Sequence, residues 1–381
     1  MRRTLPRCSA LLKSDTCRQR RRSRGEFDPR PVWYCLRPML QVLGSVVLGG
    51  LVLGAPLALV ALWVAAGHRG VGLRAPVALL GFFTVMTGFL AMGVPLQSRS
   101  IIAGLWATEA LAIALPAVAI IRGAGVRLAP YLGFRAPSGK ALLVAAVAAL
   151  ANQPVVSLLT FAAHALLPGD WVADFDSKQQ MLNDIFKGQA QAMVVTVAIA
   201  APLGEELFFR GFALPALGRS MKLGWAVVLS GALFSLLHLD PIGFIGLWEI
   251  GVLLALLRIW SGSLWPAILA HATNNAIAGA AFLMGYEDPS APPPLWFLLL
   301  GGALLAFGIF LATKVLQRGD PAAAGSEQPR AGVDDPGHFR LGRAGPLFTV
   351  WLIAFAAGTA MLVTSQRPRP APAELPPQAA P

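Results

Sequence analysis

Residues 204–211 read GEELFFRG, and they lie inside a run of apolar residues long enough to cross a lipid bilayer. The stretch puts Glu205, Glu206 and Arg210 where an ionisable side chain costs about 2.5–3.5 kcal/mol on insertion scales. Charged residues inside such segments are rare and usually serve a function. These three side chains therefore indicate a protein embedded in a membrane and mark the place to look for its functional site.

The composition around this stretch is that of a membrane protein. Of the 381 residues, 56% are hydrophobic and 13% are charged, whereas an ordinary soluble domain has about 25% charged residues. Several apolar runs reach the ~20 residues that a helix needs to span a bilayer. The runs are continuous and do not alternate in segments of about ten residues, which favours helices over a β-barrel. We predict an all-α, polytopic transmembrane helical bundle of about 8–10 spans with an intramembrane polar cavity.

The predicted spans and the division of the chain follow these apolar runs. The spans are 39–66, 76–97, 101–121, 141–167, 191–216, 223–239, 242–260, 264–285, 295–315 and 346–364. We divide the chain into a basic N-terminal tail (1–38), N-terminal transmembrane helices (39–129), a core that carries the polar motifs (130–285), C-terminal transmembrane helices (286–364) with a polar loop (316–345), and a Pro- and Ala-rich tail that we expect to be disordered (365–381).

The first 38 residues differ from the rest of the chain. They carry eleven of the 31 Lys and Arg residues and all three cysteines, Cys8, Cys17 and Cys35. A basic segment beside a membrane span binds anionic lipid or fixes the orientation of the protein, and we expect no nucleic acid partner. The later residues hold no disulfide framework and no cysteine-based metal site. An alternative is that translation starts at Met39 and that the tail is not made.

The charges on the loops predict an orientation. Basic residues gather in 122–140, 217–222 and 314–343, and acidic residues in 168–190 and 286–289. The positive-inside rule then puts the three basic segments in the cytoplasm. This orientation conflicts with the strongly basic tail, because it places the beginning of the first span outside.

Helical spacing sorts the charges of the opening stretch. Glu206 and Arg210 are four residues apart, so they share one face of a helix and can form an ion pair that lowers the cost of insertion. Glu205 points about 100° away from Glu206 and is less well placed to share that partner. We therefore expect Glu205 to face other helices as an unpaired buried carboxylate, a suitable general base.

Two later helices offer complementary groups. Phe234 and His238 are four residues apart, as are His271 and Asn275. One carboxylate, two imidazoles and an amide form a set that can activate a water molecule. The position of His238 at the end of its apolar run requires the sixth helix to tilt or to continue if all four groups are to meet.

Each polar residue also has a structural interpretation. A histidine or an amide in a membrane helix often bridges neighbouring helices, and glutamates near a helix end can contact lipid headgroups. We assign that structural interpretation to Glu109 and Asn274, and we leave Glu249 open. Three polar motifs on three successive helices favour a common site for the remaining residues.

The three motifs resemble those of the CPBP family of intramembrane proteases, which includes type II CAAX prenyl endopeptidases and Abi-like bacterial proteins. The family patterns EExxxR, FxxxH and HxxxN have their counterparts in the following residues: Glu205, Glu206 and Arg210, then Phe234 and His238, then His271 and Asn275. The segments YLGFRAPSGK and SGSLWPAILAHATNN are also similar to the family, and the resemblance extends over about 130–285.

The resemblance implies hydrolysis of a peptide bond inside or beside the membrane. It implies that Glu205 activates water with the help of His238, that His271 and Asn275 orient the water or stabilise the oxyanion, and that Glu206 and Arg210 hold the first motif in place. The cofactor question stays open. A zinc ion on Glu205, His238 and His271 is one alternative, although the HExxH pattern of zinc proteases is absent, and catalysis by the same residues without a metal is the other.

We predict an intramembrane endopeptidase of this family that acts on a membrane-associated protein or peptide, with membrane lipid as its surroundings. The high content of Ala, Gly, Arg and Pro is typical of a bacterium with GC-rich DNA, so we expect the protein in the bacterial inner (cytoplasmic) membrane. Two alternatives remain. One is a non-catalytic immunity or binding protein on the same fold, and the other is a transporter that uses the polar residues as an ion path, although the repeats typical of transporters are missing.

Overall fold

The computed structural model describes residues 57–186, 188–284, 290–317 and 339–365. The chain divides into two compact units, Met1–Ala58 and Leu59–Pro381, and we describe the second. The following predictions lie wholly or largely outside the described residues: the basic tail, the start at Met39, most of the span 39–66, the acidic segment 286–289, most of the loop 316–345 and the tail 365–381. The boundaries of the motif-bearing core at residues 129 and 285 also stay predictions.

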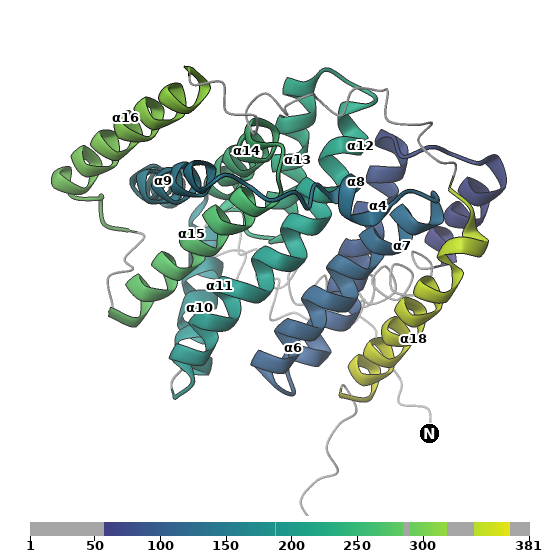
Figure 1. Cartoon of the computed structure of the whole chain (residues 1–381). Coiled ribbons are helices and arrows are strands. Elements are labelled where there is room, and N and C mark those ends of the chain that lie inside the picture. Colours follow the sequence, from purple (N-terminus) through teal and green to yellow (C-terminus); the bar gives the residue numbers. More distant parts are fainter. Residues whose placement is uncertain (1–56, 187, 285–289, 318–338, 366–381) are drawn as a thin grey trace, which may run out of the picture. The chain divides into compact units, whose positions relative to one another are not determined.

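Every regular element of the described residues is a helix, so the all-α prediction is confirmed (Figure 1). The helices are α4 (Ala75–Gly88), η1 (Phe89–Gly93), α5 (Val94–Gln97), α6 (Ile101–Ala107), η2 (Thr108–Ala114), α7 (Leu115–Gly123), α8 (Leu128–Leu132), α9 (Gly139–Leu166), α10 (Gly169–Phe186), α11 (Ala190–Glu206), η3 (Leu207–Ala213), α12 (Leu214–Gly218), α13 (Leu223–Leu237), α14 (Phe244–Ser261), α15 (Trp265–Met284), α16 (Leu295–Gln317) and α18 (Leu341–Ser365).

The described residues contain eight helices long and apolar enough to cross a membrane, which agrees with the predicted polytopic bundle of about 8–10 spans. They are Ala75–Gln97, Ile101–Gly123, Gly139–Leu166, Ala190–Gly218, Phe244–Ser261, Trp265–Met284, Leu295–Ala312 and Leu341–Met361. The predicted sixth span is shorter than expected, because α13 has 15 residues and ends before His238. The acidic segment 168–190, treated above as a loop, is largely the helix α10, which turns the ring of Phe175 toward His164.

Three of the spans contain a π-helical turn. These turns, η1, η2 and η3, each end two residues before a proline, namely Pro95, Pro116 and Pro215. Proline lacks an N–H group and its ring clashes with the carbonyl group four residues earlier, so an α-helix cannot continue undisturbed through it. A wider turn just upstream is one way to accommodate it, and such turns are frequent at functional sites. The turns η2 and η3 contain or adjoin buried charged residues of this protein.

The core and the outer surface of the bundle are both apolar. Phe208, Phe209 and Phe212 lie on η3 at 0% exposure and pack within the main core. The outermost helix, α16, packs on α9 and leaves much of its apolar surface uncovered (Figure 1). Exposed residues such as Trp225 and Ile353 indicate a surface made for lipid.

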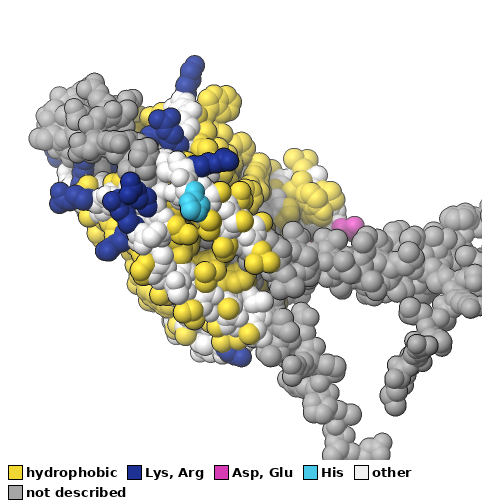
Figure 2. Space-filling model, turned by 90° about the vertical axis from the view of Figure 1, so that its right-hand side faces the viewer, with side chains coloured by type: hydrophobic (Ala, Val, Ile, Leu, Met, Phe, Trp, Pro, Cys, Tyr) yellow, Lys and Arg dark blue, Asp and Glu magenta, His cyan; other side chains and the backbone are white. Residues whose placement is uncertain are grey.

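The basic loops meet at one end of the bundle. Hydrogen bonds join them: the N–H of Arg340 donates to the carbonyl of Gly123, Leu264 to Gly133, and Ala75 to the hydroxyl of Ser220. Figure 2 shows most of the Lys and Arg side chains of one face gathered at one end, with apolar side chains over much of the remainder. This is the end that the positive-inside rule assigns to the cytoplasm, and the orientation itself stays a prediction.

Candidate active site

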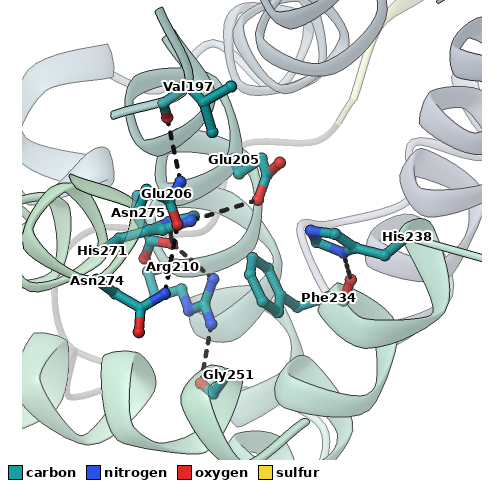
Figure 3. Close-up of polar contacts among 10 residues, drawn as sticks. All are labelled: Val197, Glu205, Glu206, Arg210, Phe234, His238, Gly251, His271, Asn274 and Asn275. Carbon is teal, nitrogen blue, oxygen red and sulfur yellow. Dashed lines mark hydrogen bonds and ion pairs between the residues drawn. The ribbon is translucent and has the colours of Figure 1, made fainter. Parts of the chain in front are cut away.

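The opening stretch forms the junction of α11 and η3 in the middle of a span. Glu205 and Glu206 are the last two residues of α11, and Arg210 lies on η3. Glu206 and Arg210 are both 0% exposed. The ion pair expected from their spacing is present, because Nη1 of Arg210 donates to Oε1 of Glu206 over 2.8 Å (Figure 3). The pair neutralises two charges at a place where single charges would be costly.

Arg210 also ties the first motif to two other helices. Its Nη2 donates to the carbonyl oxygen of Gly251 on α14 over 2.9 Å. Its guanidinium carbon lies 4.5 Å from the centre of the Phe234 ring on α13, a cation–π distance. The close approach of α14 to α13 depends on Gly251, since a Cβ atom there would lie 2.7 Å from the Cα of Gly231. Arg210 therefore acts as a clamp among three helices.

His271 connects the two glutamates. It lies on α15 at 3% exposure. Its Nδ1 is 2.9 Å from Oε1 of Glu206, and its Nε2 is 3.9 Å from Oε2 of Glu205 (Figure 3). Since Glu206 is a carboxylate paired with Arg210, Nδ1 carries the proton and donates it to Glu206. This hydrogen bond fixes the ring and aims Nε2 at Glu205.

Glu205 is the carboxylate without a partner of its own, as the spacing predicts. Its Oε2 is buried and has no hydrogen-bond donor among the described residues. A separation of 3.9 Å from Nε2 of His271 is too long for a direct hydrogen bond. If an oxygen atom lay ~2.8 Å from both Nε2 of His271 and Oε2 of Glu205, the angle between the two contacts would be roughly 90°. This geometry suits a water molecule bound to both atoms.

His238 does not join this cluster directly. It follows α13 as the residue that caps it, and its Nδ1 lies 2.9 Å from the carbonyl oxygen of Phe234. The ring of Phe234 stands between the two imidazoles, with its centre 4.9 Å from that of His238 and 5.5 Å from that of His271 (Figure 3). The four groups expected at one site therefore meet as two subsets separated by an aromatic ring.

Asn275 lies one turn beyond His271 on α15, and it points toward α11. Its Nδ2 donates over 3.1 Å to the carbonyl of Val197, about two helical turns before Glu205. One of its two N–H groups is therefore already engaged. Its Oδ1 accepts a bond from Nδ2 of Asn274, whose own oxygen accepts from Gln153 on α9 over 2.8 Å. Asn274 is thus a link between helices, as the structural interpretation expects.

Glu249 lies on α14 outside the cluster. It is half-buried, and its Oε2 accepts a 2.8 Å hydrogen bond from Nδ2 of Asn152 on α9. The sequence left this residue open, and the structure shows a bridge between helices. Neither Gln153 nor Asn152 was singled out by the sequence, although both are amides within a predicted span, which was the available signal.

The geometry does not favour the predicted metal set. Among the described residues, no three His, Cys, Asp or Glu side chains come close enough to hold one metal ion. For Glu205, His238 and His271 the physical reason is the Phe234 ring between the imidazoles. The Nδ1 of His271 is also engaged with Glu206.

Comparison with known proteins bears on the same segment. The family model described as Type II CAAX prenyl endopeptidase Rce1-like matches residues 188–277. We call these residues the Rce1-like segment, after the family model that they match. The Rce1-like segment contains all three motifs and both ends of every contact within the Glu205–His271 cluster. It is shorter than the predicted extent of 130–285 and covers about a quarter of the 381 residues. No curated protein and no solved structure matches the chain.

One buried carboxylate beside the site comes from outside the Rce1-like segment. Glu109 lies on η2 at 6% exposure, and its side chain contacts the backbone at Gly204, the residue before Glu205. Its carboxyl group interacts electrostatically with that of Glu205. The sequence assigned a structural role to Glu109 and could not show which helix it faces.

Proposed function

We propose that this protein is an intramembrane endopeptidase in which Glu205 activates the water that attacks a peptide bond. The observation that carries the proposal is the chain of contacts from Arg210 through Glu206 and His271 to Glu205. It supplies a buried carboxylate, an oriented imidazole beside it and a charge-neutralising pair behind it. The Rce1-like family is one of peptidases, which supports the same reaction class.

The proposed reaction begins with a water molecule held by Glu205 and Nε2 of His271. Glu205 accepts one proton as the water oxygen forms a bond to the carbonyl carbon of the substrate. The tetrahedral intermediate carries a negative oxygen, which needs hydrogen-bond donors. The proton held by Glu205 then passes to the leaving nitrogen as the C–N bond breaks. Protons and electrons balance: the first products are a carboxylic acid and an amine, which become a carboxylate and an ammonium group when the acid gives its proton to the amine.

The other predicted residues fall into supporting roles in this proposal. Asn275 has one N–H without a protein acceptor among the described residues, and that group is the proposed oxyanion donor. His238 assists from behind Phe234 and is the proposed donor to a substrate group that enters from that side. Glu206 and Arg210 hold His271 and the first motif, so they act through other residues and do not touch the substrate.

The proposed substrate is a membrane-associated protein or peptide. The family description names prenyl endopeptidases that act on CAAX sequences, and a C-terminal peptide with a prenylated cysteine is accordingly one candidate. A GC-rich composition favours a bacterial cytoplasmic membrane, where a hydrophobic membrane peptide without a prenyl group is the other candidate. The bundle is an integral membrane protein in either case.

The test is cleavage by purified protein in lipid vesicles. A library of quenched membrane peptides, with and without a prenylated C-terminal cysteine, is incubated with the wild type and with Glu205→Gln and His271→Ala. We expect each variant to lose about 10²–10⁴-fold in kcat, the usual contribution of a general acid or base. Cleavage that persists unchanged in folded Glu205→Gln would exclude Glu205 as the base.

Glu249→Gln is the matched control for Glu205→Gln. It removes a carboxylate from a neighbouring span by the same substitution, and its partner is Asn152 rather than a residue of the cluster. We expect cleavage by Glu249→Gln to stay within a few-fold of the wild type. An equal loss in both variants would indicate a general effect of intramembrane carboxylates on folding, and would count against the proposal.

A further inference from the structure

We propose that Glu109 is a protonated carboxylic acid that positions Glu205, so that the two side chains form a buried carboxyl pair with one proton. The pair joins η2, outside the Rce1-like segment, to the end of α11 within it. Its role in cleavage rests on the proposed function, whereas the pair itself does not. Glu109 is therefore proposed as a positioning residue that acts through the base.

The first support is the packing of the two helices. A Cβ atom at residue 204 would collide with Oε2 of Glu109 and would lie 3.1 Å from its backbone oxygen. Glycine at this position lets the Glu109 side chain lie against α11 without being displaced, one residue before Glu205. The approach brings the two carboxyl groups within electrostatic range of each other.

The second support is the lack of other partners. Both Oε2 of Glu109 and Oε2 of Glu205 are buried without a hydrogen-bond donor among the described residues. A buried carboxylate oxygen without a donor is costly. A proton on one of two neighbouring carboxyl groups turns that group into a donor and removes half of the charge at the same time.

The surroundings decide which carboxyl group holds the proton. Glu205 has the imidazole of His271 at 3.9 Å, and the guanidinium of Arg210 acts on it from the next turn. The elements that pack against η2 are α4, α6, α7, α11, α18, η1 and η3. Their charged residues are Glu205, Glu206 and Arg210 near the site, and Arg122 and Arg343 at the basic end of the bundle.

Glu109 therefore faces a carboxylate and no cation of its own. Glu206 and Arg210 already neutralise each other, and Arg122 is 13 positions along the same span, about 20 Å away. Two adjacent carboxylates in a buried site do not both ionise, and the one with the nearer cations keeps the charge. The structure thus assigns the charge to Glu205 and the proton to Glu109.

The direct test is infrared spectroscopy of the whole protein in lipid at neutral pH, which needs no substrate. A protonated buried carboxyl group gives a carbonyl stretch separate from that of carboxylates. We expect this band in the wild type, its loss in Glu109→Gln, and a shifted but persistent band in Glu205→Gln. A band unchanged in folded Glu109→Gln would overturn the assignment.

Two further variants keep the test decisive. Thr108→Val changes the neighbouring residue of η2, whose hydroxyl bonds to the carbonyl of Gly104, and should leave the band in place. Gly204→Ala changes no carboxyl group but its Cβ displaces the carboxyl group of Glu109, so it should shift the band. If Glu109→Gln fails to fold, an unshifted band in Gly204→Ala overturns the proposal.

The positioning role has its own readout in peptide cleavage. Glu109→Gln keeps a neutral hydrogen-bond donor, so kcat should stay within about tenfold of the wild type. Glu109→Leu removes the donor and should lower kcat by about 10- to 150-fold with little change in KM, as expected for a lost hydrogen bond to a charged group. Equal losses in both variants would overturn the role. If the wild type cleaves no peptide while the infrared result holds, the proposed function fails and the carboxyl pair stands.

Discussion

Arg210→Met should lower the free energy of unfolding of this protein more than any substitution on its lipid-facing surface. Arg210 is fully buried, and it makes an ion pair with Glu206 at 2.8 Å, a hydrogen bond with Gly251 at 2.9 Å and a cation–π contact with Phe234. Methionine fills a similar length of space without the charge. Among the described residues, the substitution leaves the charge of Glu206 with only His271 as its partner.

The size of the expected loss in unfolding free energy depends on the charge of Glu206, which stays buried. Breaking a buried ion pair by removing one member costs about 3–5 kcal/mol, since the other charge remains buried. Coulomb's law gives about 6 kcal/mol for unit charges 2.8 Å apart at an effective dielectric constant of about 20, so a loss of this size is reasonable. His271 still donates to Glu206, and the ion pair is not bidentate, because Oε2 of Glu206 and Nε of Arg210 have no partner among the described residues. We therefore expect the lower part of the range, about 3 kcal/mol.

A double variant separates stability from activity. In Glu206→Leu/Arg210→Met no charge is left without a partner, and an apolar replacement of a buried ion pair is often neutral or stabilising. We expect this variant to recover most of the free energy of unfolding lost in Arg210→Met. It should nevertheless remain inactive, because His271 has lost the acceptor that orients its ring.

The assay is equilibrium unfolding in mixed micelles, followed by tryptophan fluorescence, with peptide cleavage measured on the same preparations. Arg219→Met is the matched control, since Arg219 is half-buried and its hydrogen bonds to Leu73 and Tyr131 are long, at 3.4 Å each. We expect that control to lose about 1 kcal/mol. The reasoning is refuted if Arg210→Met loses no more than the control, or if the double variant is no more stable than the single one.

Three further predictions concern packing, alkaline stability and metal. Gly251→Ala should destabilise the protein by about 1–3 kcal/mol, because its Cβ would lie 2.7 Å from the Cα of Gly231. The control, Gly224→Ala, places its Cβ in open space and should be neutral or slightly stabilising. Equal free energies of unfolding for the two variants would contradict this prediction. Burial raises the pKa of Tyr131 from 10.0 to about 12, with Arg219 opposing the shift, so its contribution to stability is complete below pH 10 and is lost as the pH rises to 12. Relative to Tyr131→Phe, the wild type should therefore lose about 3 kcal/mol of unfolding free energy between those pH values, and parallel curves would refute the assignment. Cleavage by purified protein should survive a strong chelator, since the described residues bring no three ligand side chains together; activity abolished by chelation and restored by zinc would show that the site rearranges around a metal.

Local spacing is the part of the site that the sequence predicted well. The four-residue interval from Glu206 to Arg210 fixes a common helix face, so the ion pair needs no knowledge of other helices. The apolar runs likewise required membrane helices, because no other element satisfies its backbone in lipid without closing into a barrel. The end of the sixth span was predicted less well, since a predicted span can extend past the last residue of the helix, as 223–239 extends past Leu237.

The spacing of residues along the sequence did not predict which helices contact each other. His238 and His271 both lie four residues from a motif partner, yet nothing in either interval shows that the Phe234 ring separates them. The same limit applies to Glu109, whose neighbour Gly204 is 95 positions away in the chain. Such pairings depend on the rotation of each helix about its axis, and the π-helical turns η2 and η3 alter that rotation part-way along two spans.

The prolines after these turns therefore bear on the chemistry as well as on the fold. Pro116 and Pro215 each follow a wide turn that carries or adjoins a buried charge. A π-helical turn holds one residue more than an α-helical turn, so it rotates everything beyond it relative to a regular helix. Without η3, the residues after Arg210 would face other neighbours, and the aromatic packing of Phe212 with Phe208 would change. The same wide turns that let proline enter a membrane helix thus hold Glu109 beside Gly204 and Arg210 beside Glu206.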